Sequence, residues 1–334
     1  MKKFKIIISA VLVFVLTLPL ISCSKKTYEI KNSYDEIYSS PDYSFDITAG
    51  DEFKILKIND THFINGTCND DKKTLDELKT VLDKTPFDLI IVDGDLVEGY
   101  NSKLSYNKYK AVSLFAELIE SYNVPWTFAP GNNDGQKDGS NQDLIAFMLQ
   151  YKNFIAGNEE GIDGSMQFFI DLKQNCELVH SIAILDSHSP DDNGEYDYIK
   201  ENQIDWLIGG INERKVKTSV FFHMPTPAFE TAYKQGTAYN NFPFSDEYSV
   251  SDIEKNSLFD EKTENNEYIT LLSTAHVHSD NIAYLYNNRY YQLSSLGGYG
   301  AAGSKNTAPS FTLTTINVNE QDVDKLYTFE KVSA

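Results

Sequence analysis

Carboxylate, amide and imidazole side chains follow the ends of several hydrophobic runs. Phe53 to Ile58 leads into Asn59-Asp60-Thr61-His62, Leu89 to Val92 leads into Asp93-Gly94-Asp95, and Val124 to Phe128 leads into Gly131-Asn132-Asn133-Asp134. Two later runs lead to His223 and to Ala275-His276-Val277-His278, which places four of the six histidines at such ends. Hard oxygen donors mixed with imidazoles suit Mn, Fe or Zn, so these residues predict a metal site.

The hydrophobic runs have to be strands if they are to bring these polar residues together. Helical periodicity separates the first runs, with apolar residues on one face of 74–82 and again over 104–122 and 144–149. The order strand, helix, strand indicates parallel strands, and open α/β sheets gather their sites where the carboxyl ends of such strands meet. The polar residues are therefore expected at one sheet edge.

The second half of the chain is richer in strand patterns. We expect strands at 166–172, 181–185, 219–222, 268–272, 282–286, 290–293 and 311–318. The acidic, aromatic and Asn-rich stretch 226–266 lacks periodicity and is interpreted as a long surface excursion. It is either a solvated insertion or an arch whose aromatic residues contact a substrate, with these candidates: Tyr239, Phe242, Phe244 and Tyr248.

Taken in order, the five polar blocks resemble the calcineurin-like metallophosphoesterase family. That family carries D-x-H, G-D-x-x-[DE], G-N-H-[DE], a lone His and G-H-x-H, and the corresponding blocks here span Asp60 to His278. The resemblance implies an α/β fold, a four-layer α/β/β/α sandwich of two mixed sheets. It is looser toward the purple-acid-phosphatase-like branch, carried by the flanks Val124-Pro125-Trp126, His223-Met224-Pro225 and Gly297-Gly298-Tyr299-Gly300.

The same resemblance implies a ligand set for two metal ions. One ion would be held by Asp60, His62, Asp95 and His278, and the other by Asp95, Asn132, His223 and His276, with Asp95 as the bridge. The implied reaction is hydrolysis of a phosphomonoester or small phosphodiester by metal-bound hydroxide, with a small phosphorylated substrate as the partner. This reaction needs neither a protein nucleophile nor an organic cofactor.

The blocks depart from the family pattern in three places. Asn133 replaces the His that binds phosphate and protonates the leaving group, and an amide has no proton to give. Three explanations are open: a substrate with a good leaving group, a proton supplied by Asp134 or His188, or a site that binds metal and phosphate without turnover. Ala275 replaces Gly, a mild change, and Glu98 replaces the tyrosine of purple enzymes, so we expect a colourless protein.

The 5′-nucleotidases are the alternative phosphoesterase relatives. Asn59-Asp60-Thr61-His62 suggests them, but the sequence continues only to Ala334 after His278, and we expect no separate nucleotide-binding domain. Nucleotides therefore rank second as a substrate class.

The N-terminus has the pattern of an export signal. Lys2, Lys3 and Lys5 precede an apolar run from Ile6 to Leu18, and Leu20-Ile21-Ser22-Cys23 resembles the bacterial lipobox. We expect a lipoprotein signal peptide over 1–22, a lipid on Cys23, a polar tether over 23–44 and a metallophosphoesterase domain over 45–334. The alternative is a signal anchor that stays uncleaved, because the apolar run is close to membrane-spanning length. Either way the domain is exported and membrane-attached.

Composition limits the other partners. The formal net charge is −20, so the field of the protein repels polyanions, and no cluster of Lys and Arg indicates a nucleic-acid track. With 41% hydrophobic residues the chain can bury a large core. Cys68 and Cys176 could form one disulfide or stay apart, and nothing in the sequence fixes the oligomeric state.

Overall fold

The computed structural model of the chain describes residues 28–39, 43–47, 50–99, 106–190, 194, 196–239, 257–278 and 281–334. The expected signal peptide and Cys23 lie outside these residues. Within these ranges, no helix has both the length and the apolar character needed to cross a membrane.

The smaller of two sheets carries the first polar blocks. It has five strands in the order β13-β12-β2-β3-β4, with β2, β3 and β4 parallel and β12 antiparallel to both neighbours. Helix α1 connects β2 to β3, and α2 connects β3 to β4. The strands of this sheet are β2 Glu52–Ile58, β3 Leu89–Asp93, β4 Trp126–Ala129, β12 Phe311–Asn317 and β13 Tyr327–Val332.

The larger sheet carries the last two blocks. It has eight strands in the order β1-β5-β6-β7-β9-β11-β10-β8, and its centre is the parallel run β6, β7, β9 and β11. The strands are β1 Tyr43–Asp46, β5 Gln167–Gln174, β6 Glu177–Leu185, β7 Thr218–Phe221, β8 Thr237–Ala238, β9 Ile269–Thr274, β10 Ile282–Tyr286 and β11 Arg289–Leu293.

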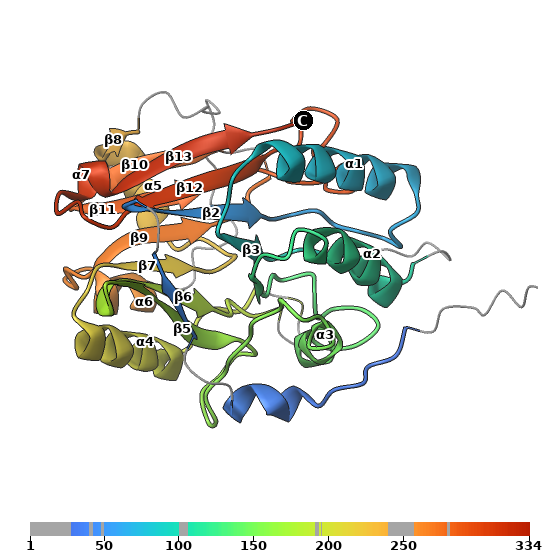
Figure 1. Cartoon of the computed structure of the whole chain (residues 1–334), viewed down its shortest axis with the longest axis horizontal. Helices are drawn as coiled ribbons and strands as arrows, with labels where there is room; N and C mark the ends of the chain where they lie inside the picture. The colour runs from blue at the N-terminus through green and yellow to red at the C-terminus, as the bar shows by residue number, and fades with distance from the viewer. Residues whose placement is uncertain are drawn as a thin grey trace, which may run out of the picture.

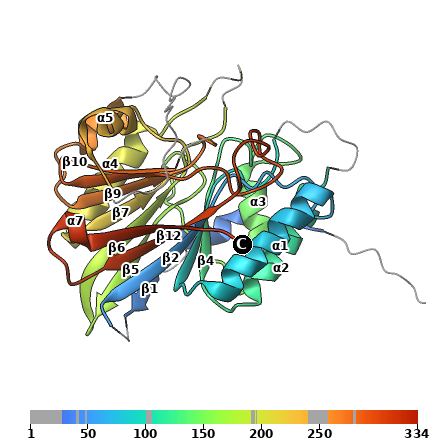
Figure 2. The same cartoon turned by 90° about the horizontal axis from the view of Figure 1, so that it is seen from above.

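Helices cover the outer face of each sheet (Figures 1 and 2). Helices α1, α2 and α3 lie together beside the five-stranded sheet, while α4 packs on β6 and on α6, and α5 packs on β10. The helices are η1 Tyr34–Ser39, α1 Asn69–Lys84, α2 Lys108–Glu120, α3 Asn141–Met148, α4 Glu201–Arg214, α5 Ala228–Gln235, α6 Leu258–Thr263 and α7 Val323–Leu326. The predicted four-layer α/β/β/α sandwich of two mixed sheets is confirmed.

Hydrophobic residues fill the spaces between these layers. One cluster joins the inner sheet faces to the first three helices and includes Ile55, Ile91 and Phe115, all fully buried. A second cluster lies between the larger sheet and its helices and includes Leu185 and Leu207. Polar side chains also cross between the two sheets: Tyr327 of β13 hydrogen-bonds with Ser219 and Thr270 of the larger sheet.

The folded part begins earlier than the predicted start at residue 45. Residues 34–39 form η1, in which Ile37 is buried, and Tyr34 donates a hydrogen bond to the carbonyl of Ser165. Strand β1 pairs in parallel with β5. The predicted tether over 23–44 is therefore wrong for these residues. A six-residue 3-10 helix and a four-residue strand are too short to show periodicity.

Two further segments differ from expectation. Helix α4 was not predicted, because Gly209-Gly210 interrupts the apolar pattern in its middle. The predicted excursion 226–266 contains α5 and α6, which bury Phe229 and Phe259 against the larger sheet. Tyr239 is partly buried and packs on Tyr290 and Phe329 at the margin of the main core. The other three aromatic candidates, Phe242, Phe244 and Tyr248, lie outside the described residues.

Cys68 and Cys176 do not form a disulfide. Cys68 precedes α1 and is partly buried, while Cys176 lies in the exposed turn between β5 and β6, and both are free thiols.

Candidate metal centre

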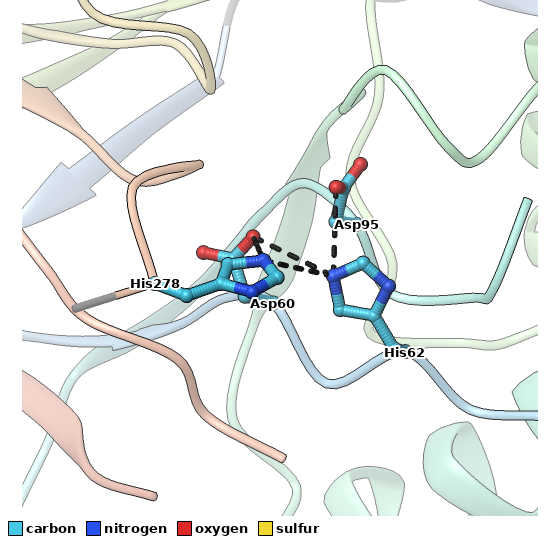
Figure 3. Close-up of side chains that lie close together, drawn as sticks. All are labelled: Asp60, His62, Asp95 and His278. Atoms are coloured by element: carbon cyan, nitrogen blue, oxygen red, sulfur yellow. Dashed lines mark hydrogen bonds and ion pairs between the residues drawn. The ribbon is translucent and has the colours of Figure 1, made fainter. Parts of the chain in front are cut away.

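The loops that follow five strand ends meet between the two sheets. Asp60 and His62 follow β2, Asp95 follows β3, and Asn132 follows β4. From the larger sheet, His223 follows β7, and His276 and His278 follow β9. All seven side chains that were predicted as ligands are thus brought to one place, and Figure 3 shows four of them pointing toward one another.

The donor atoms form two groups that share one carboxylate. In the first group, Asp60, His62, Asp95 and His278 each offer one atom, and these atoms all lie within 4.8 Å of one another. Asp95, His223 and His276 form the second group in the same way. The Oδ1 atom of Asn132 lies 2.8 Å from Nδ1 of His276, and therefore joins the second group. Asp95 is the residue that the two groups share.

Distances between the donor atoms fit the edges of a metal coordination shell. Nε2 of His62 lies 3.1 Å from Nε2 of His278 and 3.6 Å from Oδ2 of Asp95. Nε2 of His278 lies 3.3 Å from Oδ1 of Asp60, and Nε2 of His223 lies 3.4 Å from Oδ2 of Asp95. Ligands bound at about 2.1 Å and separated by 90–120° lie about 3.0–3.6 Å apart.

Unusual backbone angles aim these side chains. Asp60, His62, Asp95 and His276 all have φ between 47° and 70°, the left-handed region that residues other than glycine rarely adopt. Hydrogen bonds between loops hold them there: the N–H of Asp60 donates to the carbonyl of Gly94, and the N–H of His62 donates to that of Asp95. Such clustered strain is typical of functional sites.

Two glycines let the loops approach closely. Gly94 has a φ of 77°, and a Cβ on it would lie 2.3 Å from Nδ1 of His223. A Cβ on Gly131 would lie 2.3 Å from the backbone nitrogen of Asp95. Both glycines are part of the motifs for this reason. Ala275, which replaces a family glycine, is buried and is not among the residues with positive φ, so its methyl group is tolerated.

Hydrogen bonds from the far side of the rings orient the histidines. Nδ1 of His223 donates to the carbonyl of Asp93, at 2.8 Å, and Nδ1 of His278 donates to that of Ala302, at 2.7 Å. Since a carbonyl only accepts, each Nδ1 carries a proton, and Nε2 is the ring nitrogen that faces the cluster. Glu98 lies 3.5 Å from Nδ1 of His62 and has the corresponding position there. This arrangement is usual around metal-binding histidines.

Without a metal ion, the buried carboxylates attract protons to the nearest histidines. Burial alone lowers the pKa of His62, but the neighbouring Asp60, Glu98 and Asp95 outweigh it and raise that pKa to about 10. In the same way, Asp95 and Asp60 overcome burial and raise the pKa of His223 to about 10. The cluster therefore requires positive charge, which a metal cation supplies.

The remaining titrations agree with a cation site. Against the effect of burial, His223 and His278 hold the pKa of Asp60 well below its usual range, and His223 and His62 do the same for Asp95. Burial, and then the charge of His223, lower the pKa of His276 to about 4. His276 is thus a neutral imidazole near pH 7, the form that binds metal.

Two buried atoms of the candidate metal ligands lack hydrogen-bond partners in the described part of the chain. They are Oδ1 of Asp60 and Nε2 of His223, both fully buried and both directed into the cluster. Leaving such groups unpaired in the interior is expensive unless an ion or water satisfies them. A divalent or trivalent cation between them fits the residues present.

Asn133 lies beside the shared carboxylate. Its backbone N–H donates to Oδ1 of Asp95 at 2.8 Å, and its side-chain Nδ2 donates to Oδ2 of Asp95 at 2.5 Å. The side chain is buried and belongs to the cluster. A neutral amide here donates hydrogen bonds but has no proton to transfer.

The two other candidates for proton supply have different partners. Asp134 is fully buried, and its carboxylate accepts hydrogen bonds from the N–H groups of Asp95, Gly131 and Val97. It therefore fastens the loops after β3 and β4 to each other. Nε2 of the His188 ring contacts Oε1 of Gln203, and the backbone N–H of His188 donates to the carboxylate of Asp186. Within the described residues, the carboxylate of Asp134 thus binds the backbone of these loops, and the ring of His188 binds Gln203.

Two residues near the centre were not identified as site residues from the sequence. Glu98 was noted only for what it replaces, although its place in the second block is a signal for contact with His62. Tyr196 packs edge-on against His276, with ring centroids 5.1 Å apart, and is exposed beside the centre. No motif marks it, because its position depends on how the loop before α4 folds.

Known proteins share this sequence pattern and fold. The profile of the calcineurin-like phosphoesterase family matches residues 53–295. A Schizosaccharomyces pombe protein of unknown function is 26% identical over 57% of this chain, and the probable inactive purple acid phosphatase 29 of Arabidopsis thaliana is 26% identical over 53%. These matches cover only 40% and 55% of the two relatives.

A solved structure has the same fold at low sequence identity. The dimetal phosphatase of Danio rerio superimposes with a TM-score of 0.54 at 12% identity, over 78% of this chain and 92% of that one. The family profile spans more than two thirds of the sequence and includes all five blocks of the centre, from Asp60 to His278. The chain belongs to the calcineurin-like phosphoesterase family.

Proposed function

We propose that this protein is a metal-dependent phosphoric ester hydrolase that acts on a phosphomonoester or a small phosphodiester. The observation that supports this most directly is the pair of donor groups that share Asp95. One ion would be held by Asp60, His62, Asp95 and His278, and the other by Asp95, Asn132, His223 and His276. Two bound ions of Mn, Fe or Zn would polarise a phosphoryl oxygen and activate water for attack on phosphorus.

The residues of the chain define how a leaving group would depart. Asn133 reaches Asp95 with one amide hydrogen, and its second hydrogen can bind a phosphoryl or ester oxygen. Since Asn133 cannot protonate that oxygen, and since Asp134 and His188 have other partners, the departing oxygen leaves as an anion. We therefore propose that the preferred substrates have leaving groups of low pKa, such as aryl phosphates.

A second candidate function is binding of metal and phosphate without turnover. Asn133 supports it, because general acid catalysis is worth about 10²–10⁴-fold in rate. The similarity to a plant protein named a probable inactive phosphatase supports it as well. The complete donor groups are common to both candidates, so metal content alone does not distinguish them.

The deciding experiment compares metal content and hydrolysis in matched variants. The chain from Ser24 to Ala334 is purified, metal per chain is measured, and aryl phosphomonoesters and diesters are assayed. Asp95→Asn weakens the shared ligand and is expected to abolish binding of at least one ion and all hydrolysis. The matched control is Asp171→Asn, which removes the same charge on β5, where Asp171 pairs with Arg214.

Each outcome assigns a function. Hydrolysis by the wild type and by Asp171→Asn, but not by Asp95→Asn, supports the hydrolase. Two metal ions without hydrolysis, with activity appearing in Asn133→His, supports the binding protein. Fewer than about one metal ion per chain in the wild type would sink both.

We also propose that the protein is exported and anchored to the membrane through a lipid on Cys23. The support is the sequence pattern alone, with its basic start, apolar run and lipobox. In a bacterial host, the wild type should fractionate with membranes and incorporate labelled fatty acid. Cys23→Ser should lose the label, and retention of the label in this variant would contradict the proposal.

A further inference from the structure

A lysine side chain is buried between the two sheets directly beneath the metal centre. Lys57 lies on β2 with its side chain 0% exposed, three residues before Asp60. Its ammonium group donates to Oγ of Ser273 at 2.9 Å, to the carbonyl of Thr274 at 2.6 Å and to Oε1 of Gln292 at 2.8 Å. All three acceptors belong to the larger sheet, and they use all three donor hydrogens.

The ammonium group also faces a carboxylate of its own sheet. Oδ2 of Asp93, the last residue of β3, lies 3.4 Å from Nζ of Lys57, and both side chains are fully buried. The carbonyl of Asp93 in turn accepts the hydrogen bond that orients His223. The ammonium group of Lys57 therefore links the carboxyl-terminal ends of β2, β3 and β9. Five ligands follow these strands directly: Asp60, His62, Asp95, His276 and His278.

The hydrogen bonds continue back to the smaller sheet. Gln292 donates to Ser294, and Ser294 shares a hydrogen bond of 2.7 Å with Thr312 of β12. Thr312 is the cross-strand neighbour of Lys57. The connection from Lys57 through the larger sheet to β12 is thus a closed ring of polar contacts across the gap between the sheets.

A contribution to stability alone is a poor explanation for the burial of the Lys57 ammonium group. Removing an ammonium group from water costs several kcal/mol, and apolar residues of similar volume often replace buried ion pairs without loss of stability. A buried, fully satisfied polar network does fix one arrangement of the groups that it joins. The groups joined here are the strands that hold the two halves of the ligand set.

We propose that Lys57 is a positioning residue, which sets the separation of the two sheets at their ligand-bearing ends so that both metal ions bind together. This inference rests on the proposed dinuclear centre. Lys57 touches neither substrate nor metal, and acts through the ends of β2, β3 and β9. Its loss should leave the fold intact and weaken the second metal ion more than the first.

Lys57→Met tests the proposal, because methionine retains much of the side-chain length and lacks the donors. Mn²⁺ alone is the probe, titrated into metal-free protein by calorimetry and followed by electron paramagnetic resonance. We expect the affinity for the second ion to fall about 10–100-fold, as it does when partners of metal ligands are removed. The signal of a coupled Mn pair should give way to that of isolated Mn²⁺, while the far-ultraviolet circular dichroism stays unchanged.

Tyr327→Phe is the matched control. Tyr327 is fully buried and joins the same two sheets through Ser219 and Thr270, but Thr270 lies four residues before Thr274, toward the opposite end of β9. This variant should lose stability and keep both the second-ion affinity and the coupled signal. If it loses the coupled signal as Lys57→Met does, a general loosening of the sheets explains the effect and the proposal fails.

The other outcomes are equally distinct. If Lys57→Met binds two Mn²⁺ ions with wild-type affinity and coupling, Lys57 is not a positioning residue. If Lys57→Met does not fold, Ser273→Ala removes one acceptor with the lysine in place. It should then lower second-ion affinity several-fold, and wild-type affinity in Ser273→Ala overturns the proposal. A wild type that never binds a second ion refutes the dinuclear centre instead.

Discussion

At the scale of single residues, the side chains that could hold a metal ion differ from those that were candidates for transferring a proton. All seven predicted ligands meet, whereas the three predicted catalytic positions do not act alike. Asn133 faces Asp95, Asp134 holds loops, and His188 contacts Gln203. The chemistry available at the centre therefore depends most on residue 133.

Restoring a histidine at this position should change how the rate depends on the leaving group. With wild-type protein, hydrolysis of a series of aryl phosphates should slow steeply as the pKa of the leaving phenol rises. Asn133→His should flatten this dependence, with a gain of about 10²-fold for the poorest leaving group. The measurement is kcat/KM across the series, and Asn133→Gln is the control. Equal slopes for wild type and Asn133→His would contradict the assignment.

His180 lies outside the candidate metal centre, and burial shifts its pKa. Burial, with a smaller effect of Lys217, lowers the pKa of His180 to about 3, and its Nε2 lies 2.9 Å from Oγ of Ser219. The unfolded chain takes up this proton below about pH 6.5, while the folded chain does not until about pH 3. The contribution of His180 to stability is thus complete above pH 6.5 and decreases as the pH falls toward 3.

His180→Gln should remove this pH dependence. Between pH 7 and pH 5, metal-free wild type should lose about 2 kcal/mol more of its free energy of unfolding than the variant does. Urea unfolding at both pH values measures the difference. Parallel losses in the two proteins would show that His180 is protonated in the fold.

The seven candidate ligands could be read from the sequence because each one follows a hydrophobic run within one to six residues. The roles of Lys57 and Glu98 could not be read in that way. Lys57 lies inside a strand pattern, and the acceptors of its hydrogen bonds are more than 200 residues away along the chain. Only the packing of one sheet on the other turns this lysine into a contact with three ligand-bearing strands.

At the scale of elements, the centre depends on loops that are fastened to each other. Asp134 accepts three backbone hydrogen bonds, from the N–H groups of Asp95, Gly131 and Val97. Lys108 of α2 donates to the carbonyl groups of Asp134 and Gly139 and holds the same loop from the helix side. The β3 and β4 loops thus form one unit with α2.

Asp134→Asn should loosen this unit. An amide supplies one oxygen acceptor, and its NH₂ group would face a backbone N–H, which leaves a buried donor unpaired. The expected loss in free energy of unfolding is roughly 1–3 kcal/mol. Metal affinity should fall with it, because Asp95 belongs to the loop. Denaturant unfolding and Mn²⁺ titration measure both, and Asp143→Asn, in the exposed capping box of α3, is the control. Unchanged metal affinity would contradict the role.

Element prediction succeeded where the pattern was long or bounded by a motif. The expected strands 53–58, 89–92 and 124–128 overlap β2, β3 and β4, and the expected helix 74–82 lies within α1, because continuous or periodic apolar residues mark these elements. Helix α4 was missed because paired glycines interrupt its apolar face. Strand β8 has two residues and no apolar pattern, so only its pairing with β10 defines it.

At the scale of the whole molecule, the N-terminal segment closes one edge of the larger sheet. Strand β1 pairs with β5, and the hydroxyl of Tyr43 donates to the carbonyl of Ala156 at 3.0 Å. Ile37 of η1 is 1% exposed and belongs to the main core. The sequence predicted a tether over these residues. The prediction missed their order because that order depends on contacts with distant parts of the chain, which no local pattern reveals.

Removing this segment should destabilise the fold without removing a ligand. A chain that begins at Gly50 loses the burial of Ile37 and the hydrogen bonds of Tyr34 and Tyr43, and its free energy of unfolding should fall by roughly 3 kcal/mol. A chain that begins at Tyr28 keeps these contacts and serves as the control. Urea unfolding compares the two, and equal stability would support the tether after all.

The backbone hydrogen bond from residue 133 to Asp95 has a consequence for how such a site diverges. This contact comes from the main chain, so every amino acid except proline preserves it. A lineage can therefore exchange the side chain at this position, and with it the chemistry of proton transfer, without disturbing the loop that presents the shared carboxylate. Gly94 and Gly131 have no such freedom, because any side chain there collides with the centre. During divergence, metal binding is thus inherited more faithfully than catalysis.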